Sequence, residues 1–312
     1  MKGVALLVAV TFSAAFLVLV ARRRRRRQRG QIVSIHCHNL LAMTWVEGTF
    51  GEENAKRWYG DAAWENGLLD ATRRHQLSLD AAHASGADFI CLQEVGAHEL
   101  LALRRHKLSE GYLVLWVPNA STCGHEPNGV ATLVRKGMEL VEHVALQLNG
   151  EVGASCVHCR CSDDIGVSVL NVHLSAGSTN LSEACEAVDA LERVAASHSP
   201  RGDPPRAMFM CGDFNATPDS EALQMLRNRC GFVDGFDFVD TPSFAKLPTG
   251  VGGTRIDYML YKDGRAVHAI PPKATSAARR GALGTSDLSE LLQAVGSDHT
   301  PLAASFEIRH HL

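Results

Sequence analysis

The stretch Met208–Ser220 reads MFMCGDFNATPDS, and it joins an apolar run directly to acidic and amide side chains. Its first four residues have the continuous apolar character of a strand that is covered on both faces. Side chains at positions i and i+2 of a strand point to the same face. Asp213 and Asn215 are therefore predicted to project together from the end of a buried strand.

Polar residues stand at the ends of other apolar runs in the same way. Asn171 and His173 are two positions apart in LNVHL, and Asp257 lies within RIDYML. The other members of this set are Asn39, Glu94, Asp298 and His299. One carboxylate at a strand end is usually a turn or a loop cap, but a set from separate strands predicts a shared site. Acids that meet in a buried site need compensation, and carboxylates with amides favour a hard cation such as Mg²⁺ or Mn²⁺.

Strands and helices alternate along the chain after residue 30. Helical spacing of apolar residues predicts helices over 68–85, 97–111 and 182–197, the last capped by Ser182. Strands are predicted over 32–41, 87–95, 112–118, 129–148 (two strands around Lys136-Gly137), 156–162, 166–174, 206–215, 254–261 and 300–308. The stretch 44–67, rich in Gly, Glu and Trp, is predicted to be a loop. Two further regions, 241–253 and 271–295, show no firm period and are predicted to be loops or short helices, and the roles of all three stay unassigned.

The N-terminal region differs from the rest of the chain. Gly3–Ala21 contains no charged residue and is long enough to cross a bilayer as a helix, and Arg22–Arg27 follows at once. A cleaved signal peptide is the alternative, but the basic cluster follows the apolar run and no small-residue cleavage site stands out. We expect a transmembrane anchor at 1–21 that crosses the bilayer through residues 3–21, and a basic juxtamembrane segment at 22–30 beside anionic lipids. The positive-inside rule then places one domain, residues 31–312, on the cytosolic side of an unidentified membrane.

The distribution of charge limits the classes of substrate. The first thirty residues contain eight basic and no acidic residues, and the whole chain carries −3, so residues 31–312 carry −11. Such an acidic domain is a poor general binder of nucleic-acid backbones. Aromatic residues make up only 6% of the chain, which argues against extended platforms for base stacking.

The nine cysteines suggest no complete metal site. Cys91 and Cys211 lie inside apolar runs, where cysteine behaves as a small hydrophobic residue in a reducing compartment. Cys156, Cys159 and Cys161 resemble part of a zinc site, but a second pair at the right spacing is missing. The favoured interpretation is that these three lie on alternate faces of one strand.

Six segments in order resemble the endonuclease/exonuclease/phosphatase superfamily of metal-dependent phosphoesterases: HNLL, LQEV, NVHL, GDFNATPDS, RIDYML and SDHTPL. GDFN followed by IDY and SDH is the most specific part of this resemblance, which covers nearly all of residues 31–312. CGDFNATPDS and the region Trp64–Arg73 are most similar to the carbon catabolite repressor-type deadenylases, nocturnin and angel proteins. The resemblance implies an α/β fold, a four-layer α-β-β-α sandwich with two mixed sheets and an active site at one end.

The same resemblance implies a metal site and an acid–base pair. Glu94 would be the main Mg²⁺ ligand, with Asn39 beside it and Asp298 near the ion. Asp213 would orient the attacking water and take its proton, aided by Asn215. Catalysis would then be metal-assisted attack of water on phosphorus.

The remaining predicted site residues would act on the phosphate or the substrate. His299 would donate to a phosphoryl oxygen, and Asp257 would fix its tautomer and raise its pKa. His173 would be a second donor. Asn171 would support His173. Substrate contacts are predicted for Asn171, Asn128 and Arg255. Three other histidines are expected at the surface or in loops and have no predicted role: His36, His38 and His125.

Three classes of function remain open at this point. The first is a Mg²⁺-dependent phosphodiester hydrolase, a phosphoric ester hydrolase acting on RNA 3′ ends or on a nucleotide. The second is a lipid or inositol phosphoesterase, sphingomyelinase- or phosphoinositide phosphatase-like, acting on headgroups at the membrane surface. The third is a non-catalytic tether, against which stands the presence of every expected catalytic residue. No protein partner is predicted.

Overall fold

The computed structural model describes residues 31–42, 46, 51–120, 127–162, 165–199, 207–236, 255–262, 267–270, 293 and 297–308. The predicted membrane segment 3–21 and the arginine run 22–27 lie outside these residues, as do the regions 241–253 and 271–292. Among the helices of the described part, none is long and apolar enough to cross a membrane.

The first sheet contains both ends of the described chain. Its strand order is β11 (Val267–Ile270), β12 (Leu302–Ile308), β1 (Gln31–Asn39), β2 (Phe89–Gln93), β4 (Gly129–Arg135) and β3 (Tyr112–Pro118). β1 and β2 run parallel, whereas the other neighbouring strands of this sheet are antiparallel. The polar residues that end β1 and β2 therefore lie at the same edge.

The second sheet contains the strand that ends at Asp213. Its strand order is β5 (Glu139–Leu148), β6 (Val152–Ser162), β7 (Ile165–His173), β8 (Met208–Asp213), β10 (Asp257–Lys262) and β9 (Val233–Asp234). β7 and β8 are parallel, and the other pairs are antiparallel. The predicted α/β fold with two mixed sheets is confirmed, and the turn at Lys136-Gly137 carries the chain from one sheet to the other.

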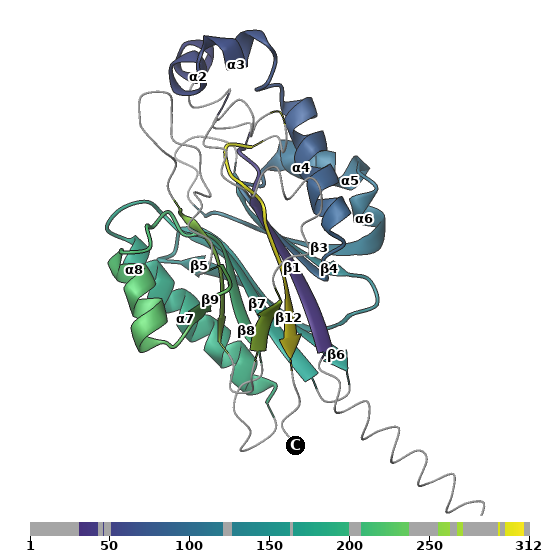
Figure 1. Cartoon of the computed structure of the whole chain (residues 1–312), viewed down its shortest axis with the longest axis vertical. Coiled ribbons are helices and arrows are strands. Elements are labelled where there is room, and N and C mark those ends of the chain that lie inside the picture. Colours follow the sequence, from purple (N-terminus) through teal and green to yellow (C-terminus); the bar gives the residue numbers. More distant parts are fainter. Residues whose placement is uncertain are drawn as a thin grey trace, which may run out of the picture.

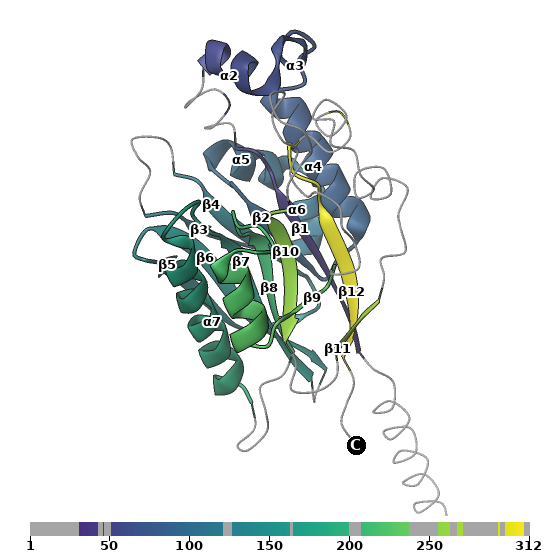
Figure 2. The same cartoon turned by 60° about the vertical axis from the view of Figure 1, so that its left-hand side comes forward.

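The two sheets pack face to face and are covered outside by helices, as Figures 1 and 2 show. Neighbouring residues of β8 point to opposite faces: Phe209 and Cys211 join the core between the sheets, and Met208 and Met210 join the core under the helices. Because both faces are buried, the strand reads as a continuous apolar run.

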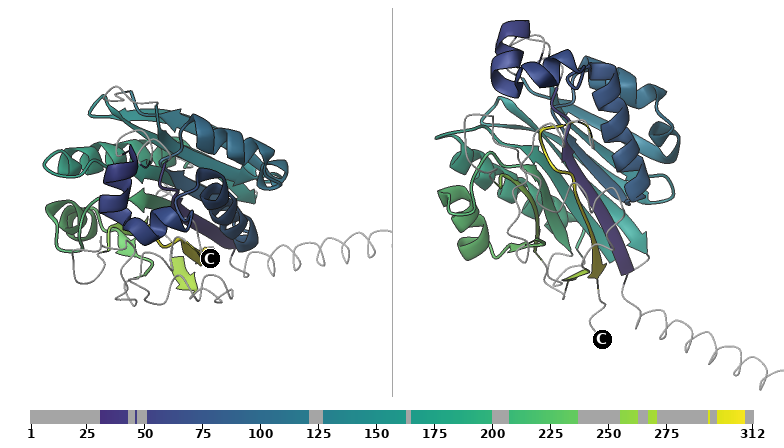
Figure 3. Two further views of the ribbon diagram at one scale, coloured as in Figure 1. Left: turned by 90° about the horizontal axis from the view of Figure 1, so that it is seen from above. Right: turned by 45° about the horizontal axis from the view of Figure 1, so that its top comes forward.

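Different helices cover the two sheets. α4 (Ala71–Ser85), α5 (Ala97–Arg105) and α6 (Leu108–Gly111) pack on the first sheet. The second sheet is covered by α7 (Asn180–Ser197), α8 (Glu221–Gln224) and the π-helix η2 (Met225–Arg229). α2 (Gly51–Tyr59) and α3 (Asp61–Glu65) lie apart from both layers, above the upper ends of β1 and α4 (Figure 3).

The helix boundaries depart from the sequence predictions for local reasons. α4 begins at Ala71 and not at residue 68, because the Asp70 side chain caps it by accepting from Arg73 N at 2.8 Å. The predicted helix 97–111 is broken at His106, whose backbone is extended, into α5 and α6. α7 begins at Asn180, two residues before the predicted cap. The prediction of a loop over 44–67 was wrong, because this region contains α2 and α3, and the short strands β9 and β11 were not predicted.

Two histidine predictions were wrong. His36 and His38 are only 2% and 1% exposed, on the face of β1 opposite to the inward-facing Ile35 and Cys37. Burial lowers the pKa of His36 to about 4 and holds the pKa of His38 well below its ordinary value. Both imidazoles are therefore neutral at pH 7.

The cysteines of β6 form no zinc cluster in the described part of the chain. Cys156 joins the core under the helices, whereas Cys159 and Cys161 face the core between the sheets. Burial raises the pKa of all three thiols to about 12, which keeps them protonated. Cys91 and Cys211 are fully buried, as predicted.

Candidate active site

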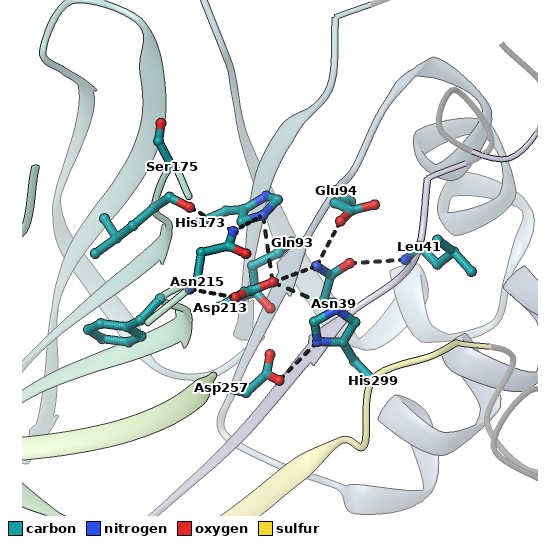
Figure 4. A network of polar contacts seen from close by, with 12 residues as sticks. Asn39, Leu41, Gln93, Glu94, His173, Ser175, Asp213, Asn215, Asp257 and His299 are labelled. Carbon is teal, nitrogen blue, oxygen red and sulfur yellow. Dashed lines mark hydrogen bonds and ion pairs between the residues drawn. The ribbon is translucent and has the colours of Figure 1, made fainter. Parts of the chain in front are cut away.

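Polar side chains from both sheets meet at one end of the sandwich, in the network shown in Figure 4. The second sheet supplies Asp213 at the end of β8. In register with it stand Asp257 at the start of β10 and His173 at the end of β7. Strand pairing alone therefore places two acids and an imidazole side by side.

A turn after β8 brings Asn215 into this group. Its backbone has φ 46°, and its N–H donates to Asp213 Oδ1 at 2.8 Å. Its amide nitrogen donates to Leu174 O at 2.8 Å and lies 3.2 Å from His173 Nε2. Asn215 thus lies beyond the strand, and the turn, not the predicted strand alternation, directs its side chain toward His173.

The first sheet contributes Asn39 and Glu94. Asn39 Nδ2 donates to Glu94 Oε1 at 2.8 Å and to Asp213 Oδ2 at 3.0 Å, which links carboxylates from the two sheets. Asn39 Oδ1 accepts from Leu41 N at 3.0 Å. Because a backbone N–H can only donate, this bond fixes which end of the carboxamide faces the acids: Asn39 presents its N–H groups, not its oxygen, to them.

The Glu94 carboxylate is held in a tight loop. Its second oxygen, Oε2, accepts from Ala42 N at 2.8 Å. Glu94 and Leu41 both have φ 56°, a left-handed conformation that is uncommon outside glycine. Glu94 is 9% exposed, so most of its hydration is replaced by these bonds.

His299 joins the two halves of the site. Its Nδ1 lies 2.9 Å from Asp257 Oδ2, and its Nε2 lies 3.7 Å from Asp213 Oδ2 and 3.9 Å from Asp298 Oδ1. Burial of the imidazole opposes its protonation, but the charge and hydrogen bond of Asp257, with Asp213 and Asp298, outweigh burial and raise the pKa of His299 well above its ordinary value. The imidazolium is the favoured form at neutral pH.

Backbone and hydroxyl contacts hold the loop that carries Asp298 and His299. Ser297 Oγ donates to Asn39 O at 2.7 Å and accepts from His299 N at 3.1 Å. Burial raises the pKa of the Asp298 carboxyl, with Glu94 acting in the same direction. Asp298 also accepts a hydrogen bond from the hydroxyl of Tyr59, whose pKa is raised by burial and by these acids.

The donor set suits a hard divalent cation. Asp213, Asp257 and His299 each offer a ligand atom, and these atoms lie within 4.8 Å of one another. Glu94 and Asp298 add two further carboxylates close by. Oxygen ligands favour Mg²⁺ or Mn²⁺ over a thiophilic metal, and because a protonated His299 offers no lone pair, Glu94 and Asp298 are the candidate ligands in this protonation state.

The family model for endonucleases, exonucleases and phosphatases matches residues 58–299 of the chain. The chain belongs to the endonuclease/exonuclease/phosphatase family. The matched region runs from Trp58 to His299 and so includes the described site residues except Asn39. No curated protein sequence matches the chain significantly.

Solved structures share the family fold. ANGEL2, described as a 2′,3′-cyclic phosphatase in complex with adenosine-2′,3′-vanadate, has a TM-score of 0.67 and 16% identity over 90% of this chain and 97% of that chain. The human nocturnin catalytic domain with bound sulfate has a TM-score of 0.57 and 17% identity over 89% of this chain and 94% of that chain. Truncated Caenorhabditis elegans TDP2 has a TM-score of 0.55 and 18% identity over 90% of this chain and 99% of that chain. At these identities the likeness shows a shared fold alone.

Two residues predicted to contact substrate, Asn171 and Arg255, form hydrogen bonds to other protein groups. Asn171 is 0% exposed and ties the sheets together: its Nδ2 donates to Leu92 O and Ala131 O at 3.2 and 3.0 Å. Arg255 donates to Asp234 Oδ1 at 2.7 Å, and its guanidinium lies 4.9 Å from the centre of the Tyr258 ring. The described geometry gives both residues structural bonds.

Asn128, the third predicted substrate contact, lies beside the Glu94 loop. Its Oδ1 accepts from Asn119 Nδ2 at 2.9 Å, and the neighbouring Gly129 exchanges backbone bonds of 2.9 and 3.1 Å with Val95. Asn128 thus lies beside the loop that holds Glu94, and its contact with substrate stays a prediction.

Two residues beside the site were missed by the sequence analysis. Tyr59 lies on α2, in a region predicted to be a loop. Arg74 lies on α4 next to the exposed Arg73, and the sequence carries no signal that tells the two arginines apart.

Proposed function

We propose that the protein is a Mg²⁺-dependent phosphoric ester hydrolase that acts on an RNA 3′ end or a nucleotide by attack of water on phosphorus. The observation that carries this proposal is the convergence of Asp213, Glu94 and the His299–Asp257 pair at one end of the sandwich. Family membership supports the class of reaction. Mg²⁺, held by Glu94 and Asp298, would neutralise charge on the phosphoryl oxygens.

Asp213 is the proposed general base. Asn215 N and Asn39 Nδ2 fix its two oxygens, so the carboxylate is held ready to orient a water and to take its proton. Asn215 also fixes the ring of His173, whose Nε2 accepts from the Asn215 amide in this geometry. A donor role for His173 on the phosphate would require this bond to break.

His299 is the proposed donor to a phosphoryl oxygen. The carboxylate of Asp257 holds the proton on Nδ1 and favours the imidazolium, whose Nε2–H faces Asp213 and Asp298 and would donate to a phosphoryl oxygen from there. A fixed donor of this kind stabilises charge that develops in the transition state.

A nucleotide or an RNA terminus is the proposed substrate class. ANGEL2, which shares the fold, binds adenosine-2′,3′-vanadate and is described as a 2′,3′-cyclic phosphatase. The charge of −11 on residues 31–312 disfavours long nucleic-acid strands. We place the catalytic activity in residues 31–312. In this proposal residues 3–21 anchor the protein in a membrane, and the catalytic domain lies on the cytosolic side.

A lipid or inositol headgroup is the second candidate substrate. The apolar stretch Gly3–Ala21 and the basic run Arg22–Arg27 favour it, because they would hold the site close to anionic headgroups.

A substrate panel tests the proposal. The purified full-length chain is assayed with Mg²⁺ and with EDTA on a 3′-adenylated RNA, adenosine 2′,3′-cyclic phosphate, a nucleotide 2′-phosphate, sphingomyelin and phosphoinositide vesicles. We expect Mg²⁺-dependent release of phosphate or nucleotide from the first three. Turnover of the lipids alone would select the second candidate, and turnover of no ester would reject a hydrolase.

A further inference from the structure

Arg74 is a buried cation behind the candidate metal ligands. It is 0% exposed, although it lies on α4, a helix whose other face is open to solvent. A fully buried guanidinium is costly unless hydrogen bonds and opposite charges compensate for the lost hydration. The contacts of Arg74 therefore indicate which groups this side chain stabilises.

The Arg74 guanidinium binds the backbone that follows β1. Nη1 donates to Leu41 O at 2.6 Å and lies 3.4 Å from Leu40 O. Nε donates to Leu69 O at 3.2 Å, and Nη2 has no hydrogen-bond partner in the described part of the chain. The short bond to Leu41 O is the strongest of these, because charged donors make short, strong hydrogen bonds.

The two peptide groups after β1 that Arg74 contacts also hold Asn39 and Glu94. The peptide with the Leu41 carbonyl donates its N–H, Ala42 N, to Glu94 Oε2 at 2.8 Å. The peptide with the Leu40 carbonyl donates its N–H, Leu41 N, to Asn39 Oδ1 at 3.0 Å. Each peptide is thus bound at its oxygen by a cation and at its N–H by a site residue.

The dipoles of these peptide groups are aligned between the Arg74 cation and the site residues. A cation at the Leu41 carbonyl polarises the peptide, which strengthens the N–H that Glu94 accepts. Burial lowers the pKa of the Arg74 guanidinium, and Glu99, Asp298 and Glu94 act in the opposite direction. A guanidinium keeps its charge under such conditions.

We propose that Arg74 is a positioning residue that orients the Leu40–Ala42 peptides and thereby fixes Glu94 for divalent-cation binding, with Asn39 held beside it as a hydrogen-bond donor. The proposal rests on the proposed function only in that it takes Glu94 as a ligand of the cation. The left-handed conformation of Leu41, with φ 56°, fits this role, because such a backbone needs contacts that hold it in place.

Substitutions at Arg74 and at its neighbour test the proposal. Arg74→Lys keeps the charge but loses the planar fork, and Arg74→Met loses both. Arg73→Lys and Arg73→Met are matched controls on an exposed position of the same helix. For each full-length variant the Kd for Mn²⁺ is measured by titration calorimetry, alongside thermal unfolding.

We expect the Mn²⁺ Kd to rise about 10- to 100-fold in both Arg74 variants, as is typical when a residue that orients a metal ligand is lost. The Arg73 variants should stay within about twofold of the wild type. A wild-type Kd in folded Arg74→Lys would overturn the proposal. A lower Mn²⁺ Kd in Arg74→Met, together with a wild-type Kd in Arg74→Lys, would show that only the charge of Arg74 acts on the site. That result would also overturn the proposal.

Amide hydrogen exchange tests the same proposal without substitution. In wild-type protein with EDTA, the N–H groups of Leu41 and Ala42 should exchange as slowly as those of β1, because Asn39 and Glu94 accept these N–H groups and Arg74 binds the carbonyls of the same peptides. Free exchange at both positions without metal would overturn the proposal, even where no Arg74 variant folds. A wild-type chain that protects these amides but hydrolyses no phosphate ester would reject the proposed function and leave the positioning role standing.

Discussion

The two halves of the candidate site are built in different ways. In the second sheet, strand register sets Asp213 beside Asp257 and His173. In the first sheet, backbone amides of a left-handed loop hold Glu94, and buried Arg74 holds those amides. A register is specified by the apolar pattern of whole strands, whereas a loop of this kind depends on a few contacts. The register-built half, in the second sheet, should therefore tolerate change nearby, and the loop-built half, in the first sheet, should not.

The largest effect is expected from Asp213→Asn, which removes the proposed base from the register-built half. A general base contributes about 10²- to 10⁴-fold, so kcat should fall by about 10³-fold at saturating Mg²⁺, or about 4 kcal/mol of transition-state stabilisation. Steady-state kinetics with the preferred ester give the value. The control is Asp219→Asn, an exposed position of the same GDFNATPDS segment, which should keep its rate. Near-normal turnover in Asp213→Asn would remove Asp213 from the mechanism.

Acid should destabilise the protein through the first sheet. The pKa of His36 is lowered to about 4, so below about pH 6.5 the unfolded chain binds a proton that the folded chain does not. The contribution of neutral His36 to the free energy of unfolding is therefore fully present above about pH 6.5. It is lost as the pH falls toward about 4, and the loss amounts to about 3 kcal/mol. His38 acts in the same direction.

His36→Leu isolates this contribution to acid stability. Neither ring nitrogen of His36 has a hydrogen-bond partner in the described part of the chain, so the replacement breaks no such bond. Urea unfolding at pH 7 and at pH 4.5 should show a smaller difference for the variant than for the wild type. An equal loss in both proteins would assign the acid sensitivity to other groups.

Asp257→Asn tests the link between the two halves. Without the carboxylate the pKa of His299 falls, so less imidazolium is present as the pH rises, and the alkaline limb of the pH–rate profile should move to lower pH. We expect about a 30-fold lower kcat, or about 2 kcal/mol, above neutral pH and a smaller loss at pH 6. A uniform loss at every pH would mean that Asp257 acts otherwise than through the protonation of His299.

The smallest effect is expected at Arg255, which the sequence predicted to contact substrate. Arg255→Lys keeps a charge beside Asp234 and should cost about 1 kcal/mol of unfolding free energy through the lost fork geometry. Its KM should stay within about twofold of the wild type. A KM that rises tenfold with unchanged stability would restore Arg255 as a substrate contact.

The same contrast explains how far the sequence could predict the molecule. The buried strands and the acids that end them were predictable, because apolar runs, period-two alternation and the order GDFN, IDY, SDH are written along the chain. The donor role of Asn39 was not, because the side on which its carboxamide presents N–H depends on Leu41 N. Arg74 could not be distinguished from Arg73, because both suit a helix and only the packing buries one of them.

The cation position is the most direct test of the whole account, because it decides which half of the site binds metal. Crystals grown with Mn²⁺ and measured at the manganese absorption edge would locate it by anomalous scattering. We expect one peak coordinated by Glu94, with the Asp257–His299 pair outside its ligand shell. A peak held instead by Asp213, Asp257 and His299, or no peak near any of these residues, would contradict the account.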